Sequence, residues 1–204
     1  MGRFKLKKQD VYIDMTAMSD VTVLLLTFFM LTSTFIKPEP VKVNTPGSVS
    51  DIKIPESNIV TILVEQSGKI FLSMDKKGDL MSVLDEMQEK YGVSFNAKQK
   101  KEFGLLPAFG LPFGQLQGFL DMPTESQNAY LKSEQNPGIP CDSLHNEFKD
   151  WILCARDVHP DLRIAIKADA NTPYSVIKNV MNSLQDLREN RYNLITSLKT
   201  TSED

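Results

Sequence analysis

The chain has 204 residues, of which 41% are hydrophobic and 24% charged, and its formal net charge is −3. This length accommodates one membrane anchor and one domain of ordinary size. The weakly acidic balance argues against a nucleic-acid partner, because nucleic-acid binding usually needs a basic surface. Charge is unevenly distributed, however: the first eight residues, MGRFKLKK, carry four positive charges and no negative one.

An apolar segment follows this basic start. From Met15 to Ile36 the only ionisable residue is Asp20, and a helix of about 20 apolar residues spans the hydrocarbon core of a bilayer. We therefore predict a single transmembrane helix over residues 15–36, ended by Lys37-Pro38-Glu39-Pro40. The positive-inside rule places residues 1–14 in the cytoplasm and the chain after the helix on the opposite side of the membrane.

A cleaved signal peptide is the alternative interpretation of this segment, since it too has a basic start and an apolar core. Asp10, Asp14 and Asp20 lie where signal peptides are rarely acidic, and no small-x-small cleavage site follows the apolar run. These features favour an uncleaved anchor.

Asp20 is the costly residue of the apolar segment, because an aspartate near a helix centre costs about 2.5–3.5 kcal/mol to insert. Asp20, Thr27 and Thr34 are spaced by seven residues, and Thr16 lies one turn before Asp20. In a helix these four residues form one polar line. The line favours contact with protein or a water-filled path, with the threonines as pore-lining candidates. The alternative is an aspartate at the cytoplasmic interface and threonines bonded to their own backbone.

The rest of the chain reads as a linker followed by a domain. Residues 37–57 are rich in Pro, Ser and Val and predict an extended linker. In residues 58–204 the pattern predicts, in order, strands at 58–64 and 69–72, a helix at 78–91, a strand at 162–168, a helix capped by Thr172-Pro173 that runs to about 189, and a strand at 192–198. This order predicts an α+β fold of two layers, in which helices cover one face of a small mixed sheet.

Residues 92–161 interrupt this order with a mostly helical insertion. Its clearest predicted helix covers 142–158, with Asp142 as the cap. Two interpretations of the insertion stay open: a docking surface for an envelope partner, and a packed elaboration of the domain.

Both cysteines, Cys141 and Cys154, fall in the insertion. They are candidates for a disulfide, which would contribute about 3 kcal/mol in the chain-entropy model, or they are two reduced thiols. His145 and His159 lie nearby, but the spacings fit no zinc pattern. The sequence also lacks a phosphate-binding loop, a nucleophile elbow and a metalloprotease motif. We therefore expect neither an enzyme nor a bound metal or cofactor, and we interpret Asp169 as a turn residue.

Three stretches, in order along the chain, carry a family resemblance. The first is Asp14-Met15-Thr16-Ala17-Met18-Ser19-Asp20-Val21 followed by VLLLTFFML, the second is Val41-Lys42-Val43-Asn44-Thr45-Pro46, and the third is IAIKADANTPYSVIKNVMNSLQDL at 164–187. Together they resemble the transmembrane signature, the extended motif after the membrane and the C-terminal strand, loop and helix of the ExbD/TolR family. Three positions depart from the family pattern: Asp14 replaces an asparagine, Ala17 a proline and Thr45 a leucine.

The resemblance implies a subunit of an ExbB–ExbD-type motor in the bacterial inner membrane. Such a motor uses the proton-motive force to energise TonB-dependent transport across the outer membrane. The helix would sit, as a homodimer, inside a ring of an ExbB/TolQ-like polytopic protein, expected to be pentameric, with Asp20 as the ion-carrying carboxylate. The domain would lie in the periplasm and act on a TonB-like protein. Proton use is the family default, and the residues themselves fit Na⁺ as well.

The short motif after the membrane supplies the partner-binding candidates Val41, Val43, Asn44 and Pro46. As a strand it could pair with its own domain, with a second copy of the chain or with the TonB-like partner. Three other functions remain open: a TolR-like motor linked to peptidoglycan, a gliding or secretion stator, and a membrane-tethered periplasmic binding module without an ion path.

Overall fold

The computed structural model describes residues 15–33, 43–48, 58–142 and 145–198 of the chain. The chain divides into an N-terminal unit, residues 1–37, and a larger unit, residues 38–204. The predicted cytoplasmic segment 1–14 and most of the predicted linker lie outside the described residues.

The N-terminal unit contains one helix, α1, over Thr16–Thr32. Its sequence TAMSDVTVLLLTFFMLT carries large apolar side chains over most of its surface, and none of its residues is buried. Within the described ranges, no helix has both the length and the apolar character needed to cross a membrane. The membrane span over 15–36 therefore stays a prediction, and its residues 34–36 lie outside the described ranges.

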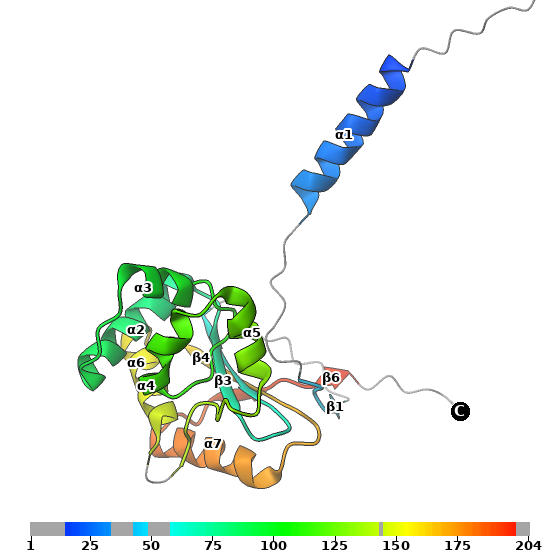
Figure 1. Cartoon of the computed structure of the whole chain (residues 1–204). Coiled ribbons are helices and arrows are strands. Elements are labelled where there is room, and N and C mark those ends of the chain that lie inside the picture. The colour runs from blue at the N-terminus through cyan, green and yellow to red at the C-terminus, as the bar shows by residue number, and fades with distance from the viewer. Residues whose placement is uncertain (1–14, 34–42, 49–57, 143–144, 199–204) are drawn as a thin grey trace, which may run out of the picture. The chain divides into compact units, whose positions relative to one another are not determined.

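The larger unit is built on a four-stranded sheet in the order β3-β2-β4-β5 (Figure 1). The strands are β2 Ile59–Val64, β3 Ile70–Met74, β4 Arg163–Ala168 and β5 Tyr192–Leu194. The hairpin partners β2 and β3 are antiparallel, whereas β4 is parallel to both β2 and β5. A separate pair, β1 Gly47–Ser48 and β6 Ser197–Leu198, is parallel. The predicted small mixed sheet is thus confirmed.

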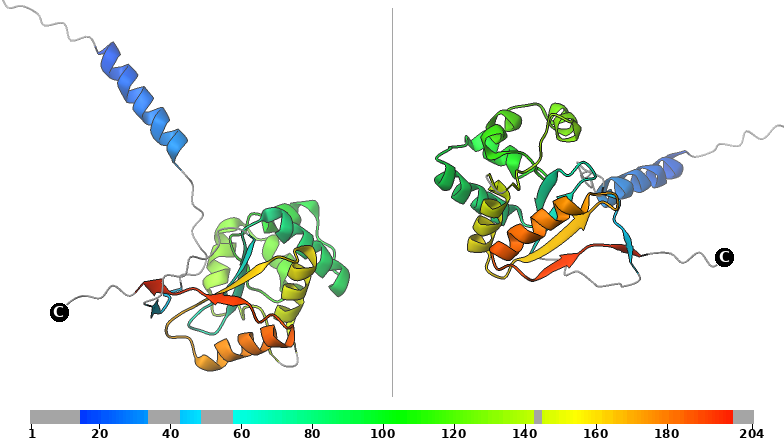
Figure 2. Two further views of the ribbon diagram at one scale, coloured as in Figure 1. Left: turned by 180° about the vertical axis from the view of Figure 1, so that it is seen from behind. Right: turned by 90° about the horizontal axis from the view of Figure 1, so that it is seen from below.

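Three helices supply the layer that the sequence predicts against this sheet: α2 Lys77–Tyr91, α6 Glu147–Val158 and α7 Tyr174–Asp186. Helix α6 contacts both α2 and α7, and Figure 2 shows α6 (yellow) and α7 (orange) side by side in both views. The core joins strand residues such as Ile62, Ile164 and Ile166 to Leu84 of α2 and Leu184 of α7, all of which are fully buried. Alternation along the strands puts their isoleucines on one face, where the helices bury them.

Helix α2 ends as the sequence predicts, at Gly92 in the left-handed conformation with φ +67°. Its inner face is buried at Leu80, Val83, Leu84 and Met87. Tyr91, one turn after Met87, is instead 37% exposed. Its hydroxyl donates to Asp150 Oδ2 at 2.6 Å, because the ring sits at the margin of the contact between α2 and α6.

The insertion supplies three further helices before α6: α3 Ala97–Phe103, α4 Phe113–Leu120 and α5 Thr124–Lys132. It also covers the outer edge of β3. Leu72 and Phe109 exchange two backbone hydrogen bonds of 2.7 and 2.9 Å, and the Ile139 N–H donates to the Ile70 carbonyl at 3.0 Å. Phe103 and Trp151 stack in the main core. The insertion is therefore packed into the domain, as the second of the two interpretations holds.

Several predicted boundaries were wrong. Helix α6 begins at Glu147 and is capped by Asn146, whose side chain accepts from the Lys149 N–H at 3.0 Å; Asp142 lies outside the helix. Helix α7 begins one residue late, because the Thr172 hydroxyl donates to the Glu65 carbonyl at 3.2 Å instead of capping the helix, and it ends at Asp186 and not at about 189. The predicted strand at 192–198 is split into β5 and β6.

Candidate functional site

Asp20 lies in the second turn of α1 and is the only ionisable residue of that helix. Its side chain is exposed. No residue that the structure describes forms a hydrogen bond or an ion pair with its carboxylate. A helix that is otherwise uncharged thus presents one unpaired acid, which is the arrangement expected of a group whose partner belongs to another molecule.

The hydroxyls of Thr22, Thr27 and Thr32 donate their hydrogens to carbonyls within α1. Thr27 Oγ1 donates to the Leu24 carbonyl at 2.9 Å, and Thr22 Oγ1 donates to the Met18 carbonyl at 2.6 Å. Thr27 is therefore left with lone pairs that accept hydrogen bonds, as in the own-backbone alternative. The regular helix keeps Thr16, Asp20 and Thr27 close to one line. Thr34, the remaining pore-lining candidate, lies outside the described residues.

Among the four partner-binding candidates, Asn44 is held by the domain itself. The Asn44 N–H donates to Asp169 Oδ2 at 3.0 Å, and the Ala170 N–H donates to the Asn44 carbonyl at 2.9 Å. We call this pair of bonds the Asn44–Asp169 clasp. Asn44 is thus attached to the chain's own domain, but residues 43–46 form no strand, so the strand pairing proposed for this motif stays a prediction.

The neighbours of Asn44 complete this attachment. Val43 is partly buried and packs against the main core, whereas Pro46 is exposed. The parallel pair of β1 and β6 follows directly after Pro46. Val41 lies outside the described residues.

Asp169 is a turn residue, as predicted, but it does more than shape a turn. Its Oδ1 accepts from the Asn171 N–H at 3.0 Å while its Oδ2 holds Asn44. The backbone N–H groups of Asn171 and Asn44 lower the pKa of Asp169, because they stabilise the charged form. Sequence reasoning missed the clasp, although both ends of it lie in stretches that carry the family resemblance.

The two cysteines are free in the structure. Cys141 Sγ lies 3.4 Å from the Ser183 hydroxyl, and Cys154 is buried on α6. Burial raises the pKa of the Cys154 thiol to about 11, so the thiol is protonated at neutral pH. The candidate disulfide is therefore not formed here. Across the described ranges, no group of three or more His, Cys, Asp or Glu residues is placed to hold a metal ion.

Comparison with known proteins bears on the N-terminal half of the chain. Residues 7–105 match the family described as Biopolymer transport protein ExbD/TolR. The chain is also 32% identical over 59 residues to the protein named Biopolymer transport protein exbD2 of Vibrio cholerae serotype O1. That alignment covers 29% of this chain and 44% of the relative, which is less than half of the relative's length.

No solved structure matches the chain. The matched segment contains α1 with Asp20, the linker with Asn44, and the β2–β3 hairpin with α2. The third resemblance, at 164–187, lies outside it. Over residues 7–105, the chain is similar to the ExbD/TolR family.

Proposed function

We propose that the chain is the ExbD-like subunit of a motor in the bacterial inner membrane, which uses the proton-motive force to energise TonB-dependent transport across the outer membrane. The observation that carries this proposal is Asp20, the single unpaired carboxylate on a helix whose large apolar side chains are all exposed. Similarity to the ExbD/TolR family supports a Ton- or Tol-type motor in general, and the name of the relative favours the Ton type.

The exposed apolar surface of α1 supports a membrane anchor over residues 15–36. Each large hydrophobic side chain of the helix is at least 55% exposed: Met18, Val21, Val23, Leu24, Leu25, Leu26, Phe28, Phe29, Met30 and Leu31. A helix that carries large apolar side chains over most of its surface is stable only where it is covered, by lipid or by other protein. Lipid on one side and a polytopic ExbB/TolQ-like partner around the line of Thr16, Asp20 and Thr27 would provide this cover.

Asp20 would carry the ion in this arrangement. A carboxylate enclosed by an apolar partner favours its neutral, protonated form, and access to water favours the charged form. Alternating between the two environments moves a proton from one side to the other, and each proton that crosses 100 mV releases about 2.3 kcal/mol. Thr27, whose lone pairs remain available, would accept a hydrogen bond from the protonated acid or from water in the path.

The Asn44–Asp169 clasp would transmit the motion of the helix to the periplasmic domain. Asn44 is bonded to the loop directly after β4, so a displacement of the linker would act on a segment that continues an inner strand of the sheet. From the domain the work would pass to a TonB-like protein. The active form is proposed to be a homodimer within the ring of the polytopic partner.

The experiment compares Asp20→Asn with wild type in the native host by measuring uptake of a large outer-membrane nutrient such as haem. Thr22→Val is the matched control, because Thr22 is a polar residue of α1 that lies off the line of Asp20. Co-purification of the polytopic partner is measured in the same cells. Loss of uptake in Asp20→Asn alone, with the complex intact, is the expected result.

Normal uptake in Asp20→Asn would contradict the Ton-type role. The family description also names TolR, so cell division and binding to cell-wall sacculi would then be measured in the same strains. A division defect with strong sacculus binding would move the assignment to a Tol-type motor. An intact complex that needs no carboxylate for any of these processes would leave a passive tether.

A further inference from the structure

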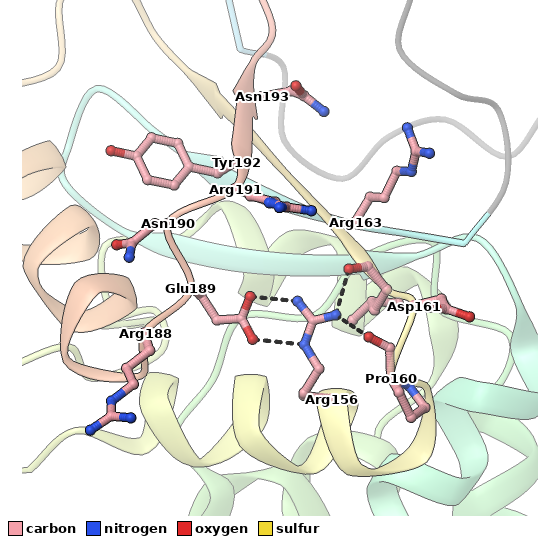
Figure 3. Close-up of a pocket in the computed structure, with 11 residues that line it drawn as sticks. Arg156, Pro160, Asp161, Arg163, Arg188, Glu189, Asn190, Arg191, Tyr192 and Asn193 are labelled. Carbon is pink, nitrogen blue, oxygen red and sulfur yellow. Dashed lines mark hydrogen bonds and ion pairs between the residues drawn. The ribbon is translucent and has the colours of Figure 1, made fainter.

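The domain contains a cavity of about 910 Å³ at the end of the sheet where β4 begins. It is enclosed by the C-terminal end of α6, the turn into β4 and the segment that leads from α7 into β5 (Figure 3). This volume lies within the range of about 300–1,000 Å³ that is typical of ligand sites. All of the lining residues follow residue 105, so the cavity lies outside the segment that matches the family.

The lining of this cavity is basic although the chain is acidic overall. Four arginines face two acids, which gives the lining a net charge of +2 against −3 for the whole chain. The charged lining residues are Arg156, Arg163, Arg188 and Arg191, with Asp161 and Glu189. A local concentration of positive charge on an acidic protein favours an anionic ligand.

Arg156 forms the floor of the cavity and donates four hydrogen bonds to protein groups. Its Nε and one terminal nitrogen donate to the two carboxylate oxygens of Glu189 at 2.7 and 2.5 Å. Its other terminal nitrogen donates to the carbonyls of Pro160 and Leu162 at 2.6 and 2.7 Å. This bidentate pair ties α6 to the segment after α7, so Arg156 and Glu189 shape the cavity and leave recognition to the other residues.

The remaining three arginines are free for a ligand. Among the residues that the structure describes, none forms a hydrogen bond or an ion pair with the side chains of Arg163, Arg188 or Arg191. Figure 3 shows Arg163 at the start of β4, and Arg188 and Arg191 on the segment between α7 and β5, with the three guanidinium groups at separate places around the cavity. The charges are therefore spread over the rim and do not converge on one point.

Arg188 occupies its rim position at a conformational cost. Its φ is +61°, a left-handed conformation at the end of α7 where glycine is the usual residue. A non-glycine residue in this conformation stores strain, and such residues cluster at functional sites. The left-handed φ of Arg188 is an observation independent of the charge count.

We propose that this cavity, the Arg163–Arg191 pocket, binds an acidic peptide segment of a partner protein. Separated carboxylates along an extended chain match three dispersed guanidinium groups, which bind carboxylates with good geometry. A single phosphate would fill only a small part of about 910 Å³ and could reach only part of the rim. The amides of Asn190 and Asn193 and the ring of Tyr192 supply polar and aromatic contacts for a peptide.

This proposal does not depend on the proposed function, because it concerns the larger unit and makes no use of Asp20. Failure of one therefore leaves the other standing. The binding experiment uses the full chain in neutral-lipid nanodiscs and a fluorescein-labelled peptide of alternating Glu and Gly. A Gln-Gly peptide of the same length is the uncharged probe, and fluorescence anisotropy is the readout.

The decisive variant pair has equal changes in net charge. In one protein Arg163 and Arg191 are both replaced by Glu; in the other the exposed lysines Lys98 and Lys178, which are not part of the lining, are both replaced by Glu. We expect the first change to weaken binding of the Glu-Gly peptide on the order of tenfold or more, and the second by less than about twofold. Thermal unfolding of both variants checks that each is folded.

Three outcomes would overturn the proposal. Equal binding of the Gln-Gly peptide would show that charge is not recognised, and equal weakening in the lysine variant would show a general charge effect. Flotation with phosphatidylglycerol vesicles, abolished by Arg163→Glu/Arg191→Glu, together with no binding of the Glu-Gly peptide, would assign the pocket to an anionic lipid surface. The proposal is supported if the protein binds the Glu-Gly peptide and only the arginine variant loses this binding.

Discussion

Helices α1 and α6 both carry many apolar side chains, but only α6 buries them against its own domain. Helix α6 has 12 residues and buries Phe148, Trp151, Ile152, Cys154 and Ala155 against its own domain, with its charged residues on the other side. Helix α1 has 17 residues, carries more apolar side chains and buries none. Burial of apolar surface contributes about 25 cal/mol per Å². No described residue buries the apolar surface of α1, so covering this surface elsewhere would be strongly favourable.

This difference indicates what covers the apolar surface of each helix. The apolar face of α6 is complementary to α2 and α7, so its sequence encodes a contact within the chain. The polar residues Thr16, Asp20 and Thr27 form only a narrow line on α1, and its one carboxylate has no described partner. Its complement is therefore expected in lipid and in another protein, which is the arrangement that we propose.

The largest expected effect is a difference in stability between matched substitutions in α6 and α1. Trp151→Ala removes a side chain that is 1% exposed and in contact with the rings of Phe103, Phe109 and Phe113. It should lower the free energy of unfolding of the domain by about 3–5 kcal/mol. The matched change in α1, Leu25→Ala, should leave that free energy unchanged. Denaturant unfolding of the full chain in micelles, followed by circular dichroism, measures both; equal effects would refute the comparison.

The second effect tests whether the insertion is an integral part of the sheet. Gly138 has φ +77°, and a Cβ there would lie 2.8 Å from the Ile70 backbone nitrogen on β3. Gly138→Ala should therefore cost about 2–3 kcal/mol through strain and overlap. Gly114→Ala is the control, because a Cβ there meets nothing within 4 Å and α4 gains a better helix former. A tolerated Gly138→Ala would mean that the insertion can leave the β3 edge.

The third effect concerns the Asn44–Asp169 clasp and is local. Asp169→Ala removes the acceptor for two backbone N–H groups, so the amides of Asn44 and Asn171 should exchange hydrogen about tenfold faster. Amides in the centre of β2 should keep their protection. Hydrogen exchange of the full chain measures both regions. Unchanged exchange at Asn44 would contradict a clasp that couples the linker to the domain.

The clasp should also depend on pH with a definite sign. The pKa of Asp169 is lowered from its ordinary value of 3.8, so the clasp is fully formed above that value and is lost as pH falls through the lower, folded-state pKa. Protection of Asn44 should therefore decrease only below about pH 4 in wild type. In Asp169→Asn, which does not titrate, the same protection should be independent of pH. A loss of Asn44 protection near pH 6 in wild type would mean that a group other than Asp169 causes the pH dependence.

The smallest expected effect comes from replacing Arg188, because this residue affects both the stability of the domain and the charge of the Arg163–Arg191 pocket. Arg188→Gly should raise the free energy of unfolding by up to about 1 kcal/mol, because glycine adopts φ +61° without strain. It should also weaken binding of the Glu-Gly peptide, because it removes one of the three free charges. Lys178→Gly, in the interior of α7, is the control and should lower stability. If Arg188→Gly lowered the free energy of unfolding, the claim that Arg188 is strained would be wrong.

The regular elements of the domain were predictable because their apolar spacing is strong. The β2–β3 hairpin, the inner face of α2 and the buried residues of β4 follow from alternation and helical period alone. The end of α6 at Val158 was predicted correctly, but its start and both ends of α7 were not predictable to the residue. The caps depend on tertiary bonds, such as Thr172 to Glu65, that sequence spacing does not reveal.

The candidate sites divide in the same way. Asp20 stands out in the sequence because a charge in an apolar run is costly, and its prediction needs no knowledge of the fold. The Asn44–Asp169 clasp joins residues 125 positions apart, and the Arg163–Arg191 pocket gathers separate segments. Neither has a local signal, because sequence spacing carries no information about contacts between distant segments.

The measurement that tests the central claim most directly is proton flux through the chain reconstituted in liposomes with its polytopic partner. Internal pH is followed under an imposed potential for wild type, Asp20→Asn and Thr22→Val. The account predicts flux in wild type and in Thr22→Val and its loss in Asp20→Asn, with the complex intact in all three. Flux in Asp20→Asn equal to wild type would contradict the role of Asp20 as the ion-carrying carboxylate.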